Sequence, residues 1–370
     1  MSINTNLVCH FNHTGVGRHC ENAYYAMTRN RPAGQAVSYV NTSREVSVRR
    51  AIGNSRADVD ISVFFWRLPK PFVQQFQGKK LVWWFFESDR IPAKWLDDIS
   101  VYDEVWLPSD WGRTVLLAHG YPLERTRVVP SGVNATVFGP QVAAQVRESA
   151  RFTFLSVGKY ENRKSIDETV EAYLAEFPAA SYPEVHLHLK ADFPMFPQRV
   201  LELSGRVAHD PRIKVVSGSF SDEQMAALYH SADAFVFASK AEGFGLPCLE
   251  ALASGLPVIA TNYSAQSVFL DRIPGLFVPI AYDIAPLVDA DYLHFYGAEY
   301  GSTDLGNWAI PSLSSLREGM RAVYEERDLW SDKAALAASR ILSDFSWNTI
   351  GALACQSITE LAGKAPASSQ

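Results

Sequence analysis

The sequence has few of the features that mark exported, membrane-spanning or metal-binding proteins. It contains four cysteines in 370 residues, and their spacing fits no metal site, so they are expected to be buried thiols in a reducing compartment. The first residues, MSINTNLVCHFNH, contain neither a basic start nor an apolar stretch of signal-peptide length. No apolar run approaches the roughly 20 residues that a transmembrane helix needs. These absences predict a cytoplasmic chain whose membrane contact, if any, is peripheral at the inner face.

The charge is unevenly shared along the chain. Residues 1–140 contain 16 Lys and Arg against 12 Asp and Glu, a balance of +4; the totals of 34 and 40 leave 18 against 28, or −10, for the rest. A basic half beside an acidic half fits a peripheral contact of the N-terminal domain with anionic lipid or an anionic acceptor, and it equally fits two ordinary solvated surfaces.

The order of apolar runs predicts two α/β domains. Short apolar runs alternate with amphipathic stretches, which is typical of a parallel sheet covered by helices. The pattern restarts after the turn-rich stretch SGVNATVFGP, with a new strand expected at 152–157. We therefore expect doubly wound, Rossmann-like domains at 1–148 and 149–345, and a final helix at 346–364. Open sheets bind ligands beyond the carboxyl ends of their strands, which places the expected site in a cleft between the domains.

The most informative segment is FVFASKAEGFGLPCLEALASGLPVIAT, which begins at residue 235. It predicts a buried strand, a glycine-rich turn, a helix with Pro247 in its first turn and a second buried strand. The turn lets backbone N–H groups approach a ligand, and the helix start offers unpaired donors to an anion. Two acids, Glu242 and Glu250, bracket this phosphate or sugar cradle.

This strand, turn and helix with its E-x7-E spacing resembles glycosyltransferase family 4, a retaining family with the GT-B fold. The resemblance implies that Glu242 lies near the transferred sugar and that Glu250 holds the ribose of a nucleotide. It also implies that the intervening backbone contacts sugar and phosphate, at Gly243, Phe244, Gly245 and Leu246.

A second match to the family is FLSVGKYENRKSIDETVEAY, which opens the second domain. The resemblance places Gly158 close to the donor and lets Arg163 and Lys164 reach the diphosphate. A leaving diphosphate gains negative charge in the transition state and needs fixed cations or a metal. No carboxylate pair with metal-binding spacing lies where a donor site would need one, so we expect the reaction to need neither metal nor cofactor.

The segment HFNHTGVGRHCENAYYAM places glycines between a first strand and a first helix. The third glycine of a dinucleotide fingerprint is missing, because Cys20 stands in its place, and this argues against a nicotinamide enzyme. In the resembled family this loop, here Gly15, Val16 and Gly17, faces the donor phosphates or the acceptor. His19 either joins that loop or is a structural histidine.

The long segment from WWFFESDR to VVPSGVNATVF resembles the family's acceptor domain. Many members have a histidine in the loop where this chain has the sequence ESDR. Glu87 or Asp89 is therefore a candidate for orienting an acceptor hydroxyl, and an ion pair of Asp89 with Arg90 is the alternative.

The combined features predict a hexosyltransferase, with a mannosyltransferase as one candidate, that uses a GDP-, UDP- or dTDP-sugar. The expected acceptor is a glycan or lipid-linked glycan in surface polysaccharide synthesis. The alternatives are an inactive nucleotide-sugar-binding protein and an enzyme that acts on a protein, a small molecule or a nucleic acid. A basic aromatic groove is missing, so a nucleic acid is the weakest of these partners.

Overall fold

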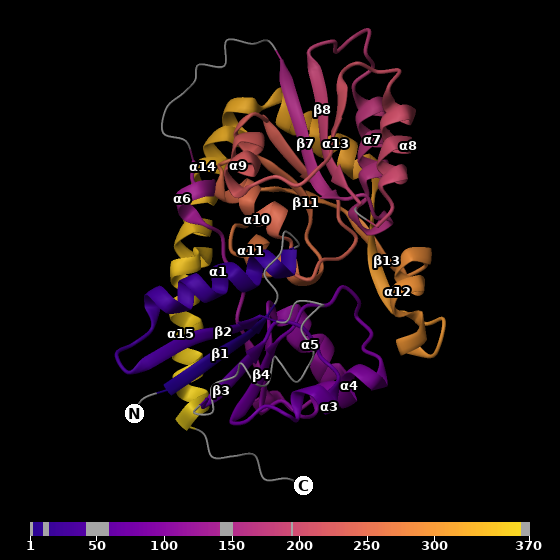
Figure 1. Ribbon diagram of the computed structural model, residues 1–370. Helices are drawn as coiled ribbons and strands as arrows, with labels where there is room; N and C mark the ends of the chain where they lie inside the picture. Colours follow the sequence, from indigo (N-terminus) through magenta and orange to yellow (C-terminus); the bar gives the residue numbers. More distant parts are fainter. Residues whose placement is uncertain (1–2, 10–14, 42–58, 141–150, 194, 364–370) are drawn as a thin grey trace. The chain divides into compact units, whose positions relative to one another are not determined.

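The computed structural model describes residues 3–9, 15–41, 59–140, 151–193 and 195–363. The chain forms two compact units (Figure 1). Unit 1 comprises Met1–Gly132, Tyr292–Gly306 and Asp344–Gln370, and unit 2 comprises Val133–Asp291 and Asn307–Ser343. The chain thus passes from one unit to the other four times.

Unit 1 is built on a parallel six-stranded sheet with the order β2-β1-β3-β4-β5-β6. The strands are β1 (Ile3–Cys9), β2 (Gln35–Asn41), β3 (Ile61–Phe64), β4 (Lys79–Trp83), β5 (Glu104–Leu107) and β6 (Thr126–Val128). The helices that alternate with them are α1 (Gly15–Asn30), α3 (Lys70–Val73), α4 (Ala93–Ile99), α5 (Asp110–Ala118) and the 3-10 turn η1 (Leu123–Arg125). Two later helices, α12 (Ala290–Tyr300) and α15 (Trp347–Gly363), place most or all of their residues in this unit.

The aromatic strands of unit 1 form its core. Phe64, Phe65, Trp83 and Trp84 are almost fully buried. Strands of a parallel sheet are covered on both faces, so these side chains fill the layers between sheet and helices. Trp66, just past the end of β3, is 40% exposed. The aromatic runs are therefore mainly core.

Unit 2 repeats the architecture with the sheet order β12-β11-β10-β7-β8-β9, again parallel throughout. Its strands are β7 (Phe152–Lys159), β8 (Val185–Asp192), β9 (Ile213–Val216), β10 (Ala234–Phe237), β11 (Val258–Thr261) and β12 (Val278–Ile280). Its helices are α6 (Ala135–Phe138), η2 (Asn162–Lys164), α7 (Ile166–Glu176), α8 (Pro197–Val207), α9 (Asp222–His230), α10 (Leu246–Ala253), η3 (Ser264–Gln266), α11 (Ser267–Leu270), α13 (Leu313–Glu325) and α14 (Arg327–Phe345).

The two sheets confirm the predicted pair of Rossmann-like units. Two features were not predicted: strand β2, and an antiparallel ribbon of β13 (Tyr282–Pro286) with β14 (Asn307–Pro311). In unit 2, β10 lies between β7 and β11. The segments that follow these three strands are therefore brought together at one edge of the sheet, where ligands bind in folds of this kind.

Candidate active site

The segment after β7 and the turn after β10 meet in unit 2. A backbone hydrogen bond joins them, in which the N–H of Lys240 donates to the carbonyl of Arg163 over 2.8 Å, and the Ser239 hydroxyl oxygen lies 3.2 Å from the same carbonyl. At Gly158 an added Cβ would lie 3.2 Å from Cγ of Lys164, so the glycine leaves room for the lysine stem. The fold thus brings Gly158, Arg163 and Lys164 beside the start of the E-x7-E motif.

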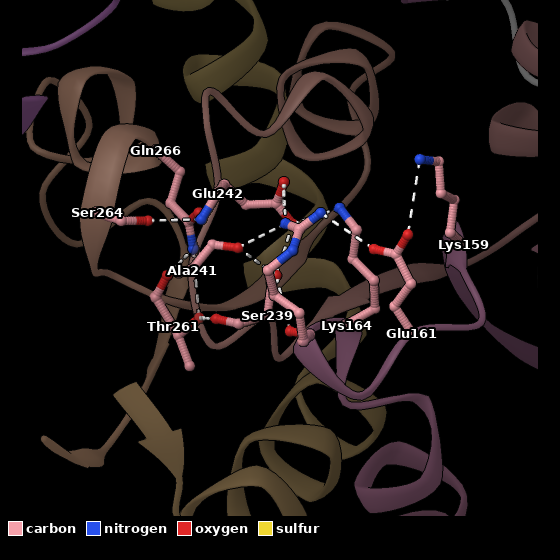
Figure 2. A network of polar contacts seen from close by, with 10 residues as sticks. Lys159, Glu161, Lys164, Ser239, Ala241, Glu242, Thr261, Ser264 and Gln266 are labelled. Carbon is pink, nitrogen blue, oxygen red and sulfur yellow. Dashed lines mark hydrogen bonds and ion pairs between the residues drawn. The ribbon is translucent and has the colours of Figure 1, made fainter. Parts of the chain in front are cut away.

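The carboxylate of Glu242 is the centre of this arrangement (Figure 2). Lys164 Nζ donates to Glu242 Oε1 over 2.5 Å, and Ser239 Oγ donates to the same oxygen over 2.5 Å. Arg163 Nη1 lies 3.2 Å from Glu242 Oε2. Glu242 is only 5% exposed. A buried carboxylate of this kind is tolerated because it is both paired and hydrogen-bonded.

Burial and charge act in opposite directions on this cluster. Burial alone would raise the pKa of Glu242, but the charges of Lys164 and Arg163 and the hydrogen bonds from Lys164 and Ser239 hold it below its usual value. Burial lowers the pKa of Lys164, and the charge of Glu242 limits that fall. Glu242 therefore stays ionised and keeps two cations in place.

Glu161 forms the outer side of the cluster. It lies 3.3 Å from Arg163 and 3.6 Å from Lys159. Burial would raise the pKa of Glu161, and Arg163, Lys159 and Lys164 more than reverse that effect. Three cations and two carboxylates thus share one small region.

Backbone strain marks the same place. Among the described residues, the non-glycine residues with positive φ are Ser165, at 52°, and Ser264, at 60°. Ser165 directly follows Lys164, and the Ser264 hydroxyl accepts a hydrogen bond of 2.7 Å from the N–H of Glu242. Such conformations are costly for residues with a Cβ, and they concentrate at functional sites. Both segments of the cluster are thus held by strained residues.

The glycine turn that follows Glu242 leads into α10. Gly245 has a φ of 93°, and an added Cβ there would lie 3.2 Å from Cβ of Gln266. Phe244 is buried against Phe269, with ring centroids 5.6 Å apart, so its side chain belongs to the core. Gly243 is buried as well, and Leu246 begins α10. What this turn can present to a ligand is its backbone and the N-terminus of α10.

Glu250 occupies a different environment from Glu242. It lies on α10, is partly buried, and its Oε2 accepts a hydrogen bond of 2.8 Å from the hydroxyl of Tyr229 on α9. The structure therefore brings Glu242 together with Arg163 and Lys164, and it anchors Glu250 separately.

In unit 1, Gly15, Val16 and Gly17 form the first turn of α1 rather than a loop before it. His19, on the same helix, is buried among the rings of Phe65, Trp83, Phe85 and Trp347. Its Nδ1 contacts the hydroxyl of Ser131. Burial lowers the pKa of His19 to about 3. This environment is that of a packed, uncharged histidine.

The loop after β4 holds Glu87 and Asp89, both partly buried. Arg90 pairs with Asp304, with Nη1 and Oδ2 2.8 Å apart. Ser88, between the two acids, is buried and donates to the carbonyl of Leu305 over 2.5 Å. The loop is thus packed against a segment more than 200 residues later in the chain.

The sequence analysis missed several residues that build the cluster. Lys240 is 5% exposed, and its Nζ lies 2.5 Å from Asn162 Oδ1 and 2.7 Å from Glu168 Oε1. It thereby joins the turn after β10 to η2 and α7. Ser239 and Ser264 bind the carboxylate and the N–H of Glu242. A polar SK pair directly after a fully apolar strand was the available signal for Ser239 and Lys240.

An Asp-x-Asp pair lies in unit 2 at Asp289 and Asp291. Arg199 bonds Asp291 through both terminal nitrogens, at 2.5 and 3.0 Å. Asp289 accepts a hydrogen bond of 3.1 Å from Asn162. Within the described part of the chain, no group of three or more His, Cys, Asp or Glu side chains is placed to hold a metal ion. In the same residues, no helix is long and apolar enough to cross a membrane.

Comparisons with known proteins show what part of unit 2 is similar to. Residues 151–290 match the family model "Glycosyl transferases group 1". The serotype-specific mannosyltransferase WbdA of Escherichia coli is 34% identical over 128 residues, which are 34% of this chain and 15% of WbdA. The chain spans less than two fifths of the length of the first curated relatives it matches.

Solved structures are similar over nearly the whole chain. Sucrose-phosphate synthase from Thermosynechococcus elongatus has a TM-score of 0.72 at 17% identity, covering 97% of this chain and 99% of that one. Anabaena HepE, in complex with UDP and glucose, has a TM-score of 0.70 at 13% identity, covering 97% and 100%. These matches confirm the predicted GT-B fold. The family model and the curated mannosyltransferase support the resemblance to glycosyltransferase family 4.

Proposed function

We propose, from the premise that residues 151–290 form a glycosyl transferases group 1 domain, that this chain is a retaining glycosyltransferase. It transfers a hexose from a nucleoside diphosphate sugar to a glycan or lipid-linked acceptor. The observation that carries the proposal is the buried contact of Glu242 with Arg163 and Lys164, directly before the glycine turn and α10.

The two cations stabilise the departing diphosphate. Negative charge grows on the phosphate oxygens as the bond to the sugar breaks, and donors that are already fixed in place cost no reorganisation at that moment. Lys164 is held by Glu242, and Arg163 by Glu242, by Glu161 and by the carbonyl of Ala241 at 2.7 Å. Glu242 acts twice in this proposal, because it aligns the cations and contacts the transferred sugar.

The rest of the donor fits along α10. The backbone of Gly243, Phe244, Gly245 and Leu246, with the N-terminus of α10 and Gly158, contacts sugar and phosphate. Glu250 accepts hydrogen bonds from the ribose, and Tyr229 holds its carboxylate in orientation. Carboxylate and ribose hydroxyls form charge-assisted hydrogen bonds, which are the stronger kind.

The sugar keeps its anomeric configuration in the proposed reaction. The bond between the sugar and the leaving phosphate breaks, the acceptor oxygen takes the same face, and a leaving phosphate oxygen receives the acceptor proton. The two cations take the place of a metal in this scheme. Activity that survives EDTA would agree with this, and activity lost on chelation and restored by a divalent cation would contradict it.

The likeness to WbdA favours mannose as the hexose, and the HepE complex with UDP and glucose supports a nucleotide donor; GDP, UDP and dTDP are the candidate carriers. Residues 1–148 take the acceptor in this proposal, through the start of α1 at Gly15–Gly17 and the loop of Glu87 and Asp89. The proposed setting is surface polysaccharide assembly at the inner face of the cytoplasmic membrane.

The test is sugar transfer from GDP-, UDP- and dTDP-hexoses to alkyl mannosides and alkyl glucosides. Transfer is measured by the release of the nucleoside diphosphate. Lys164→Ala should abolish transfer and leave the protein folded. Glu176→Gln is the control, because Glu176 also pairs with two guanidiniums, those of Arg317 and Arg321, and takes no part in the cluster around Glu242. Transfer that persists in Lys164→Ala would remove the proposed role of the cations.

A further inference from the structure

A segment of the second half of the chain belongs to unit 1. We call residues Tyr292–Gly306 the strap. The strap is joined at both ends to unit 2, because β13 and β14 on either side of it pair with each other there. It contains most of α12, drawn in orange in Figure 1.

Three tyrosines fix α12 in place. Tyr292, Tyr296 and Tyr300 are spaced by four residues, so they share one face of the helix. The rings of Tyr296 and Tyr300 lie 5.8 and 5.6 Å from the ring of Trp95 on α4. Between them, Glu299 lies 2.7 Å from Arg67 and accepts a bond from the indole of Trp95. The strap is therefore packed and paired against α4.

The end of the strap holds the loop that carries Glu87 and Asp89. Tyr300 donates its hydroxyl to the carbonyl of Arg90 over 2.9 Å, and Asp304 pairs with the Arg90 side chain. The carbonyl of Leu305 accepts the hydroxyl of the buried Ser88. Each of these bonds reaches the loop from a different strap residue.

Gly306, the last residue of the strap, lies in close contact with Ser88 and Asp89 of the loop. Its φ is 91°, and an added Cβ would lie 2.4 Å from Ser88 Oγ and 2.5 Å from Asp89 Oδ1. Only glycine fits this conformation and this approach. The strap thus fixes the backbone conformation of the loop and lets the Asp89 carboxylate lie close to Gly306.

The charged groups of the Glu87–Arg90 loop indicate which kind of acceptor the loop can bind. The loop carries the carboxylates of Glu87 and Asp89, and the Arg90 guanidinium beside them pairs with Asp304 of the strap. Burial raises the pKa of Tyr292, and the charge of Glu87 adds to that rise, so its hydroxyl stays uncharged. Carboxylates accept hydrogen bonds from neutral hydroxyls and repel phosphate.

We propose that the strap positions the Glu87–Arg90 loop and thereby selects a neutral, hydroxyl-rich sugar as the acceptor. This rests on the proposed function, in which unit 1 takes the acceptor. Tyr300, Asp304 and Gly306 are positioning residues, because they act through Ser88, Asp89 and Arg90 and not on the substrate.

The test uses Tyr300→Phe, which removes one hydroxyl and keeps the ring. Tyr324→Phe is the matched control, because Tyr324 donates its hydroxyl to Glu184 over 2.5 Å in unit 2. Loss of one hydrogen bond corresponds to about a five- to tenfold change in an equilibrium constant. Tyr300→Phe should raise KM for a neutral alkyl mannoside about that much, with the Kd of the nucleotide unchanged. An unchanged KM would overturn the proposal.

A second measurement needs no substrate. Hydrogen exchange should become faster at the amides of residues 87–90 in Tyr300→Phe and in Asp304→Asn, and it should stay unchanged at residues 242–250. Unchanged exchange at 87–90 would overturn the strap's role even if the enzyme were active. A wild type that binds no nucleotide contradicts the proposed function instead, so the two failures are distinguishable. Better transfer to a mannose phosphate than to the neutral mannoside would overturn the proposed selectivity.

Discussion

The buried cluster around Glu242 makes a prediction about charge balance. Glu242→Gln keeps the size of the side chain and removes its charge, so Lys164 and Arg163 stay buried with one counter-charge fewer. Breaking a buried ion pair by removing one partner costs about 3–5 kcal/mol. Arg163 keeps Glu161 and the carbonyl of Ala241, which favours the lower limit. For a unit of this size, about 3 kcal/mol corresponds to a fall in Tm of roughly 6–12 °C.

A nucleoside diphosphate should reverse much of that loss. In the wild type the diphosphate shares the two cations with Glu242, whereas in Glu242→Gln it supplies the missing negative charge. The rise in Tm with UDP or GDP should therefore be larger in Glu242→Gln than in the wild type. Sugar transfer by this variant should fall far more than its nucleotide binding does.

Differential scanning fluorimetry with and without nucleotide measures both effects. Glu176→Gln is the control: it also leaves two guanidiniums with one partner fewer, but these are partly exposed, so its Tm should fall less, and nucleotide should stabilise it no more than the wild type. The reasoning is refuted if the nucleotide that stabilises the wild type gives Glu242→Gln an equal or smaller rise in Tm.

Three further predictions concern neighbouring groups. Ser264→Ala and Ser264→Gly both lose the hydrogen bond to the Glu242 N–H, and both should lower transfer. The glycine variant relieves the positive φ, so chemical denaturation should show it to be about 1 kcal/mol more stable than the alanine variant. The opposite order of stability would contradict backbone strain at this position. Tyr229→Phe removes one hydrogen bond from the Glu250 carboxylate and should raise the Kd of the nucleotide about fivefold by calorimetry; an unchanged Kd would exclude that role. His19 has a folded pKa of about 3, below its unfolded value, so its contribution is present above about pH 6.5 and is lost at about 1.4 kcal/mol per pH unit as pH falls. Stability of His19→Gln, measured from pH 6 to pH 4, should lack this slope, and an identical slope would show that His19 does not cause it.

Much of the fold could be predicted, because unbroken apolar runs, such as the one that begins in β4 and the one at β10, are distinctive of a parallel sheet. Strand β2, QAVSYVN, was missed because polar residues interrupt its apolar pattern. The strap was missed for a different reason. Its partners Trp95 and Ser88 lie more than 200 residues earlier, and nothing within VDADYLHFYGAEY indicates them.

The residues of the candidate site could be named from the sequence, but their arrangement could not. The motifs indicated Glu242, Arg163 and Lys164 separately, as a sugar contact and two phosphate contacts. That all three share one buried cluster depends on the adjacency of β7 and β10 in the sheet, which local patterns do not encode. The burial of His19 likewise depends on Trp347, at the start of the last helix.

The central claim is that unit 2 binds a nucleoside diphosphate through Arg163, Lys164 and Glu250. The most direct test is isothermal titration calorimetry of the wild type, Lys164→Ala and Glu250→Ala with UDP, GDP and dTDP. The account predicts that one of the three nucleotides binds the wild type, that Lys164→Ala weakens binding of the diphosphate more than of the corresponding nucleoside, and that Glu250→Ala weakens both. If none of the three nucleotides binds the wild type, or if both variants bind as the wild type does, the account is contradicted.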